Sequence, residues 1–531
     1  MAWLAAILCL SVVSKAVQCA SPFNYTFPDD FMFGAASASY QVEGAWNVDG
    51  KGLQVWDEFT HTHPDRIFDN SSGDDSAKSY YKYKEDIKAI KDMGMQFYRF
   101  SISWARIMPT GLPNYINQRG IDYYNNLINE VLSSGLFPLV TMFHWDLPSH
   151  LQRFGGFTSD AIVTYFEEYA DVLYKNFGDR VKWWLTLNEP FSFANGYETS
   201  LMAPGTNLSG IGVYLSSHNM IKAHARAYRL YDTKYRSVQQ GKVSLTIPIL
   251  WSEPLNRSSI ADRKAAELSL QQKAGLYCHP IFSKAGDYPQ ELKDKIAERS
   301  RAQGFQKSRL PEFTPEEIEY IRGSADFLGL NEYTSYLVSA AKPNLELSYE
   351  NDIDANVYIP VQWIESNTSS WLTIAPKSIR RILQWFKKEY GPDWEILITE
   401  NGFADDGTLN DNTRITYLAT YMVEMLQAMY IDKSKVIGHT VWSVIDNFEW
   451  TAGYTSKFGL YHVDFNDPNR KRTPKKSSFF MANITQTKII PKKYLKVAQH
   501  IDAVEASSRS RIKLLPFVGV GAYNKNHHTM A

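Results

Sequence analysis

Cysteine is nearly absent from this sequence of 531 residues, which contains only Cys9, Cys19 and Cys278. The first two lie in an N-terminal segment with the features of a cleaved signal peptide, so the mature chain would retain Cys278 alone. A single cysteine cannot form a disulfide within one chain. The sequence therefore excludes a disulfide-stabilised domain, and stability must come from the hydrophobic core.

An excess of charge of one sign is also missing, and so is any apolar run long enough to cross a membrane. The 56 basic and 57 acidic side chains leave a formal net charge of −1, whereas nucleic-acid-binding domains usually carry a basic excess. The apolar runs at residues 5–13 and 513–523 are shorter than the roughly 20 residues that a membrane helix needs. We therefore expect neither a nucleic-acid partner nor membrane insertion.

No Pro-, Gly- or Ser-rich linker divides residues 25–495, and we find no internal repeat with a period of tens of residues. We therefore predict a signal peptide at residues 1–20, one folded domain at residues 21–495 and a disordered tail at residues 496–531. A polar terminal extension usually makes few contacts with the core, so removal of this tail is expected to change little.

The N-terminus and the glycosylation sequons predict secretion. The apolar run at residues 5–13 is followed by small residues where a signal peptidase cleaves, although the usual basic residues before the run are missing. Six Asn-x-Ser/Thr sequons agree with passage through the secretory pathway, with the lysosome as a second destination. The sequon asparagines are Asn24, Asn70, Asn207, Asn256, Asn367 and Asn483.

Short apolar segments alternate with longer stretches of helical periodicity along the chain. Eight such segments are the predicted strands: residues 31–39, 97–103, 137–143, 182–187, 242–250, 325–330, 395–399 and 436–444. Amphipathic helices are predicted between them, for example at residues 120–134, 159–177, 216–236 and 376–390. Eight apolar strands alternating with helices predict an α/β fold of the (β/α)8 TIM-barrel type.

Two carboxyl groups stand at equivalent places in this pattern. Glu189, in Asn188-Glu189-Pro190, follows the fourth strand, and Glu400, in Thr399-Glu400-Asn401-Gly402, follows the seventh. One such glutamate is more often a structural carboxylate than a catalytic one. In a β/α barrel, however, the active site lies at the C-terminal strand ends, and a pair of carboxyl groups is what glycoside hydrolysis commonly requires.

At this point the sequence resembles glycoside hydrolase family 1, the β-glucosidase family, over about residues 27–495, essentially the whole mature core. The resemblance is to secreted animal members, especially insect β-glucosidases and myrosinase-like proteins. It is carried by ordered blocks: Phe33-Gly34-Ala35-Ala36, Gln41-Val42-Glu43-Gly44, Arg99 to Trp104, Phe143 to Pro148, Asn188-Glu189-Pro190, Thr399 to Gly402, Trp442-Ser443 and Asn447 to Trp450.

The resemblance implies a double-displacement, retaining reaction with Glu189 as general acid/base and Glu400 as nucleophile. It places Arg99, Tyr333 and Asn331 beside them as supporting residues. The positions that match the family's sugar-binding residues are Gln41, His144, Asn188, Glu449 and Trp450, with Trp442 and Phe458 as apolar walls and Trp371 beside the aglycone. Taken singly, His144, Trp442 or Phe458 would be read as ordinary core residues.

The resemblance implies a small glycoside as the substrate. We expect a monomer or a homodimer, and the sequence does not decide between the two. Two carboxyl groups complete a retaining hydrolysis without a cofactor, and the histidine pairs His61/His63 and His527/His528 lie outside any recognisable metal-binding pattern. We expect no cofactor and no metal.

Three alternatives stay open to different degrees. Myrosinase-like thioglucosidases act on glucosinolates, whose good leaving group makes an acid dispensable, so the presence of Glu189 favours O-glycosides. A 6-phosphoglycosidase is disfavoured because Glu449 would repel the phosphate. A klotho-like binding protein is disfavoured because such relatives lose one or both carboxyl groups, and both are present here. Preference among glucosides, galactosides and fucosides is undetermined.

Overall fold

The computed structural model describes residues 24–507 and 512–514. The predicted signal peptide, with Cys9 and Cys19, lies outside the described residues. Cys278, the one free cysteine in the described part of the chain, is buried. Burial raises the pKa of its thiol above the ordinary range, so this side chain behaves as a small core residue.

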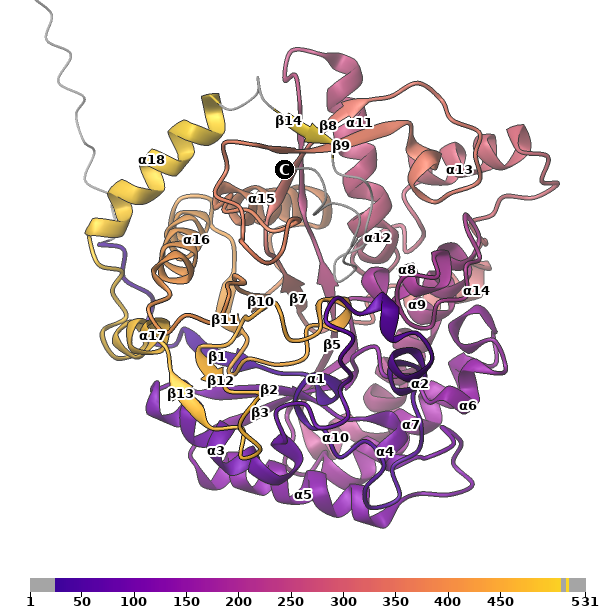
Figure 1. Cartoon of the computed structure of the whole chain (residues 1–531). Helices are drawn as coiled ribbons and strands as arrows, with labels where there is room; N and C mark the ends of the chain where they lie inside the picture. Colours follow the sequence, from indigo (N-terminus) through magenta and orange to yellow (C-terminus); the bar gives the residue numbers. More distant parts are fainter. Residues whose placement is uncertain (1–23, 508–511, 515–531) are drawn as a thin grey trace, which may run out of the picture.

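Eight parallel strands close into a barrel in the spatial order β1-β11-β10-β7-β5-β4-β3-β2. Helices surround these strands in Figure 1. The barrel strands are β1 (Met32–Ala36), β2 (Phe97–Ser101), β3 (Phe137–Phe143), β4 (Trp183–Asn188), β5 (Lys242–Pro248), β7 (Leu328–Asn331), β10 (Ile396–Asn401) and β11 (Val436–Trp442). The predicted TIM barrel is confirmed, and each predicted strand corresponds to one of these eight.

The main outer helices follow the strands in chain order. They are α3 (Ser79–Asp92), α5 (Gln118–Ser133), α7 (Ile162–Phe177), α9 (Gly212–Leu230), α12 (Leu276–Phe282), α15 (Lys377–Tyr390), α16 (Asn412–Tyr430) and α17 (Lys476–Thr487). Helix α15 illustrates why they form: Ile379, Ile382, Leu383 and Phe386 are buried at helical spacing. The helix ends where Gly391 adopts a positive φ of 96°, a conformation that costs glycine little.

The interior of the barrel changes character along the strands. Phe97, at the start of β2, packs with Leu139, Leu185 and other apolar residues near the N-terminal strand ends. Arg99 lies two residues further along β2, on the same face of the strand, and is 1% exposed. The barrel is therefore closed by apolar side chains at one end and carries buried polar groups toward the other.

A second sheet lies outside the barrel, and the sequence pattern did not predict it. It is formed by β6 (Trp251–Pro254), β8 (Ser335–Ala340), β9 (Ala355–Pro360) and β14 (Ile512–Leu514). A short antiparallel hairpin joins β12 (Tyr461–Val463) to β13 (Arg472–Pro474). Except for β14, which follows α18, these strands belong to extended connections after barrel strands, where the active-site loops of this fold occur.

The C-terminal region differs from the predicted disordered tail. Helix α18 (Lys493–Ser507) crosses the predicted boundary at Leu495 and packs against α16. Ala498 and Ile501 are buried there, and Asp502 pairs with Lys377 at 3.2 Å. Strand β14 then pairs with β9. The prediction was wrong for residues 496–507 and 512–514, because Tyr494, Ala498 and Ile501 continue a helical apolar stripe; the remaining tail residues lie outside the described ones.

Candidate active site

A pocket opens at the C-terminal ends of the barrel strands and encloses about 590 Å³, including its open mouth. Its lining comes from five of the eight strand ends and from the loops that follow them. The lining residues are His144, Trp145, Asn188, Glu189, Tyr333, Ser369, Trp371, Glu400, Trp442, Glu449, Trp450, Thr451, Ala452 and Phe458. Both predicted catalytic carboxyl groups therefore face one pocket.

Glu400 has a cation and a phenol as its partners. The Arg99 guanidinium donates to Oε1 at 2.7 Å, and the Tyr333 hydroxyl donates to Oε2 at 2.6 Å. Burial and the neighbouring Glu400 raise the pKa of Tyr333 far above its usual value, so the phenol keeps the proton that it donates. Charge and hydrogen bonds both stabilise the ionised form of a carboxyl group in such a place.

Glu189 has only neutral partners. The Asn331 amide donates to Oε1 at 2.8 Å, and the Ser192 hydroxyl donates to Oε2 at 2.6 Å. Glu189 lies between β4 and α8 (Pro190–Glu198) with a φ of 44°. That left-handed conformation is unfavourable for a non-glycine residue, and here it places the carboxyl group in the pocket wall.

Burial and, second, the negative charge of Glu400 raise the pKa of Glu189 to about 7. At 3% exposure the carboxylate loses most of its hydration, and no cation adjoins it as Arg99 adjoins Glu400. Glu189 therefore carries its proton in mildly acidic solution, which a general acid needs in order to work there.

A third carboxyl group, Glu449, lies in the pocket beside the predicted sugar-binding residue Gln41. The Gln41 amide donates to Glu449 Oε2 at 3.2 Å, and Trp442 also hydrogen-bonds to this carboxyl group. Burial, followed by the charge of Glu400, raises the pKa of Glu449 to about 8. A protonated carboxyl group can both donate and accept a hydrogen bond. It can therefore bind sugar hydroxyls, which also do both.

His144 and Asn188 form the polar wall near Arg99. The Asn188 Nδ2 lies 3.0 Å from His144 Nε2, and Arg99 donates to Asn188 Oδ1 at 2.6 Å. Burial and the charge of Arg99 lower the pKa of His144 well below its usual value. The imidazole is therefore neutral, and one of its nitrogens accepts while the other donates.

Aromatic rings form the remaining walls. Trp442 stacks on His144 with ring centroids 5.7 Å apart, and Trp371 meets the edge of Tyr333 at 5.7 Å. Tyr333 also lies edge-on to Phe458, at 6.1 Å. Such faces pack against the C–H surface of a pyranose. Trp371 is the partly exposed ring among them.

The structure brings all the predicted site residues together. Arg99, Asn331 and Gln41 lie behind the pocket surface and hold Glu400, Glu189 and Glu449 respectively. Sequence reasoning missed the lining residues Trp145, Ser369, Thr451 and Ala452 and the Glu189 partner Ser192. Ser192 had a detectable signal, because it stands three residues after Glu189 at the start of a helix.

Metal coordination has no candidate within residues 24–507 and 512–514, where no group of three or more His, Cys, Asp and Glu side chains has a metal-binding arrangement. His61 instead bonds to Asp74 at 2.8 Å. In the same part of the chain, every helix is too short or too polar to cross a bilayer.

A β/α barrel with two carboxyl groups in an aromatic pocket is the arrangement of a TIM-barrel glycoside hydrolase. The sequence model of glycosyl hydrolase family 1 matches residues 23–490, so the chain belongs to that family. Its fold, family and function as a β-glycosidase of the β-glucosidase type, predicted from the sequence, are thereby confirmed.

Two relatives and one solved structure illustrate the similarity. Myrosinase 1 of Brevicoryne brassicae is 46% identical over 469 residues, covering 87% of this chain and 99% of that protein. The cytosolic beta-glucosidase of Homo sapiens is 42% identical over 462 residues, covering 86% and 97%. The structure of an aphid myrosinase superposes with a TM-score of 0.84 at 46% identity, covering 87% of this chain and 100% of that chain.

Proposed function

We propose that the chain is a retaining β-glucosidase in which Glu400 is the nucleophile and Glu189 the general acid/base. The contrast between their partners carries this proposal. Glu400 touches the Arg99 guanidinium, whereas Glu189 touches only an amide and a hydroxyl. When two carboxyl groups share a pocket, the one beside a cation suits the nucleophile role. The one with neutral partners suits the role of proton donor.

The reaction then has two steps. In the first, a Glu400 oxygen attacks the anomeric carbon while Glu189 transfers its proton to the departing glycosidic oxygen. This step forms a glycosyl-enzyme ester and releases the aglycone alcohol. In the second step, Glu189, now ionised, takes a proton from water, and the resulting hydroxide displaces Glu400. The sugar leaves with its original anomeric configuration, and both carboxyl groups return to their starting states.

Sugar recognition is assigned to Gln41, His144, Asn188, Glu449 and Trp450, between the aromatic walls Trp442 and Phe458. Neutral imidazole, amides and a carboxyl group of raised pKa offer both donors and acceptors to ring hydroxyls. A β-glucoside is the substrate that we favour, with galactosides and fucosides as further substrates of the same pocket.

The charges of the pocket favour neutral O-glycosides over glucosinolates, although one relative is named a myrosinase. Among its described lining residues, three are glutamates and none is lysine or arginine. The nearest cation, Arg99, is already paired with Glu400. A glucosinolate brings an anionic sulfate, and burying an anion without a partner is costly. Thioglucoside hydrolysis is therefore the second candidate.

Secretion as a glycoprotein belongs to the same proposal. All six sequon asparagines are exposed, and the oligosaccharide of an N-glycan requires such a surface position. Asn24, Asn70, Asn207, Asn256, Asn367 and Asn483 are thus the proposed attachment sites. Peptide mapping after glycosidase treatment of the secreted protein tests each of them.

A mechanism-based inactivator tests the nucleophile. A 2-fluoroglucoside with an activated leaving group forms the glycosyl-enzyme but hydrolyses slowly, so mass spectrometry of the digested enzyme should find the label on Glu400. A label on another residue, or hydrolysis with inversion of the anomer by NMR, would overturn the assignment.

A further inference from the structure

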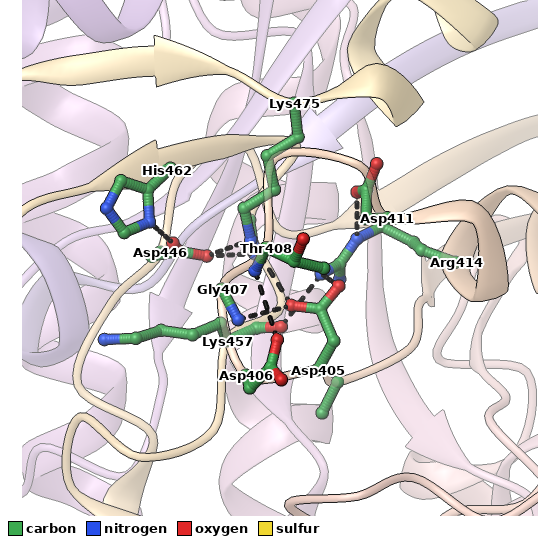
Figure 2. Close-up of polar contacts among 12 residues, drawn as sticks. Asp405, Asp406, Gly407, Thr408, Asp411, Arg414, Asp446, Lys457, His462 and Lys475 are labelled. Carbon is green, nitrogen blue, oxygen red and sulfur yellow. Dashed lines mark hydrogen bonds and ion pairs between the residues drawn. The ribbon is translucent and has the colours of Figure 1, made fainter.

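Behind the aromatic wall of the pocket lies a buried network of charges that the proposed reaction does not use. Its carboxylates are Asp405, Asp411 and Asp446, and its cations are Arg414 and Lys475. All five side chains are at most 10% exposed. Figure 2 shows the carboxylates and cations alternating through this cluster. We call these five residues the charge network.

Asp405 is the carboxylate that both cations share. Its Oδ1 lies 3.6 Å from the Lys475 ammonium, and its Oδ2 accepts from the Arg414 guanidinium. Each cation also has a carboxylate of its own, because Lys475 pairs with Asp446 at 2.8 Å and Arg414 with Asp411 at 2.8 Å. Loss of the Asp405 charge would thus separate the network into two pairs, with neither cation left alone.

The Asp405 backbone connects the charge network to the pocket walls. Asp405 and Lys457 exchange two backbone hydrogen bonds of 3.0 Å, and Phe458, the next residue, lines the pocket. Arg414 reinforces this contact by donating to the Lys457 carbonyl at 3.0 Å. The Ser443 backbone N–H also donates to the Phe458 carbonyl at 3.2 Å, so the Phe458 wall has anchors that do not involve the Asp405 side chain.

The loop that carries Trp371 rests on the same segment. We define the Trp371 loop as residues 361–374. Within it, the Ser366 hydroxyl donates to the Ala404 carbonyl at 2.9 Å, and the Thr368 hydroxyl donates to the Asp405 carbonyl at 3.3 Å. Ser369, a pocket-lining residue, bonds to Ser456 at 2.9 Å. Asp405 thus contacts both the Trp371 loop and the segment of Lys457 and Phe458, which are the two pocket loops that meet here.

We propose that Asp405 is a positioning residue that sets aglycone specificity, because its shared ion pairs hold the Trp371 loop against the Phe458 wall. The inference rests on the proposed function, since Trp371 matters only where an aglycone lies beside it. A carboxylate that bonds to two buried cations is held in position from two directions. The side chains that line a binding pocket need such support to keep their positions.

The test compares Asp405→Asn with Asp411→Asn. Both remove one buried carboxylate charge, but Asp411 bonds to Ser477 of α17 and not to either pocket loop. The readouts are the KM for 4-nitrophenyl β-glucoside, which reaches the aglycone wall, and the Ki for glucose, which occupies only the sugar site. Asp464→Asn, at an exposed position whose side chain bonds within its own turn, is the surface control.

Asp405→Asn should raise the aryl-glucoside KM at least 3-fold while the glucose Ki stays within 2-fold of wild type. Asp411→Asn should lower the melting temperature without changing the ratio of KM to Ki, and Asp464→Asn should change neither. Equal ratios in the Asp405→Asn and Asp411→Asn proteins would reduce Asp405 to a structural residue and overturn the inference.

A second variant keeps the inference testable if Asp405→Asn does not fold. Ser366→Ala removes the hydrogen bond from the Trp371 loop to the Ala404 carbonyl and leaves every charge in place. It should therefore also raise the KM for the aryl glucoside. An unchanged KM in Ser366→Ala would contradict the inference. Absence of aryl-glucosidase activity in the wild type would instead refute the proposed function, so the two failures are distinguishable.

Discussion

The pocket and the charge network both bury carboxyl groups, yet burial has opposite outcomes for Glu189 and Glu449 of the pocket and for Asp446 of the network. In the pocket, Glu189 and Glu449 have no adjoining cation, and burial raises their pKa values to about 7 and about 8. In the network, Asp446 is just as buried, but the charge of Lys475 and hydrogen bonds hold its pKa at about 2. Burial alone therefore does not decide the direction in which the pKa of a carboxyl group shifts, because a close cation and hydrogen bonds can outweigh it, as they do at Asp446.

This comparison separates groups that perform chemistry from groups that hold the structure. An unpaired buried carboxyl group exchanges its proton near neutral pH, which suits an acid/base catalyst. Asp446, whose pKa is lowered by its cation partner, stays charged at neutral pH and holds the structure through its ion pair with Lys475. Glu400 lies in the pocket but, unlike Glu189, has a cation, Arg99, as its partner.

The largest effect is expected from Glu400→Gly. Hydrolysis of ordinary glucosides should fall by roughly 10⁴-fold or more, since loss of the serine nucleophile costs a protease about 10⁶ in kcat. The protein should remain folded, as judged by circular dichroism and thermal unfolding. A variant that keeps more than a few per cent of wild-type kcat would remove Glu400 from the nucleophile role.

Asp446→Asn should have the opposite signature, with a large loss of stability and little loss of chemistry. The substitution leaves the Lys475 ammonium with only the more distant Asp405, and breaking a buried ion pair typically costs about 3–5 kcal/mol. Urea unfolding measures the loss, with Asp464→Asn as an exposed control. A variant as stable as wild type would show that the Asp446–Lys475 ion pair does not stabilise the fold.

The pH dependence of stability should differ between the two regions. The folded-state pKa of Asp446 lies below its ordinary 3.8, so its contribution is present above pH 3.8 and is lost as the pH falls toward 2. The difference corresponds to about 2 kcal/mol. Glu449 has a raised pKa, so its contribution is complete below pH 4.5 and is lost as the pH rises toward 8.

Denaturant unfolding at several pH values distinguishes these contributions. Asp446→Asn should flatten the acid limb of the stability curve, and Glu449→Gln should flatten the decline between pH 5 and 8. If Glu449→Gln instead steepens that decline, the Glu449 carboxyl group does not have a raised pKa in the folded protein, and its assignment as a protonated group is wrong.

A smaller effect is expected from truncation after Leu495. The structure predicts a melting temperature lower by a few degrees, because Ala498, Ile501 and the Lys377–Asp502 pair are lost. Glucosidase activity of the folded fraction should be retained, since none of these residues lines the pocket. Double substitution of Ala498 and Ile501 by serine in the full chain is the matched control, and an unchanged melting temperature in both proteins would mean that α18 contributes nothing.

Much of the fold was predictable from the sequence because barrel strands are apolar on both faces and leave a clear pattern. The polar residues after these strands, such as Glu189 and Glu400, were predictable for the same reason. The second sheet was not, because its strands lie outside the barrel and β9 is mostly half-exposed, so it lacks the continuous apolar pattern of a barrel strand. Trp145, Ser369 and Thr451 escaped because loop residues reach a pocket through backbone geometry, which no local periodicity encodes. Asp405 escaped because its partners lie far apart in the chain.

The central claim is that Glu189 is the unpaired acid of the pocket, and Glu189→Gln tests it most directly. The substitution preserves shape but removes the proton, so hydrolysis of cellobiose or alkyl glucosides should fall by about 10²–10⁴-fold. An activated dinitrophenyl glucoside leaves without a proton, so its first step should suffer far less, and azide should restore turnover by replacing base-activated water. Equal losses on both substrates without rescue by azide would contradict the account.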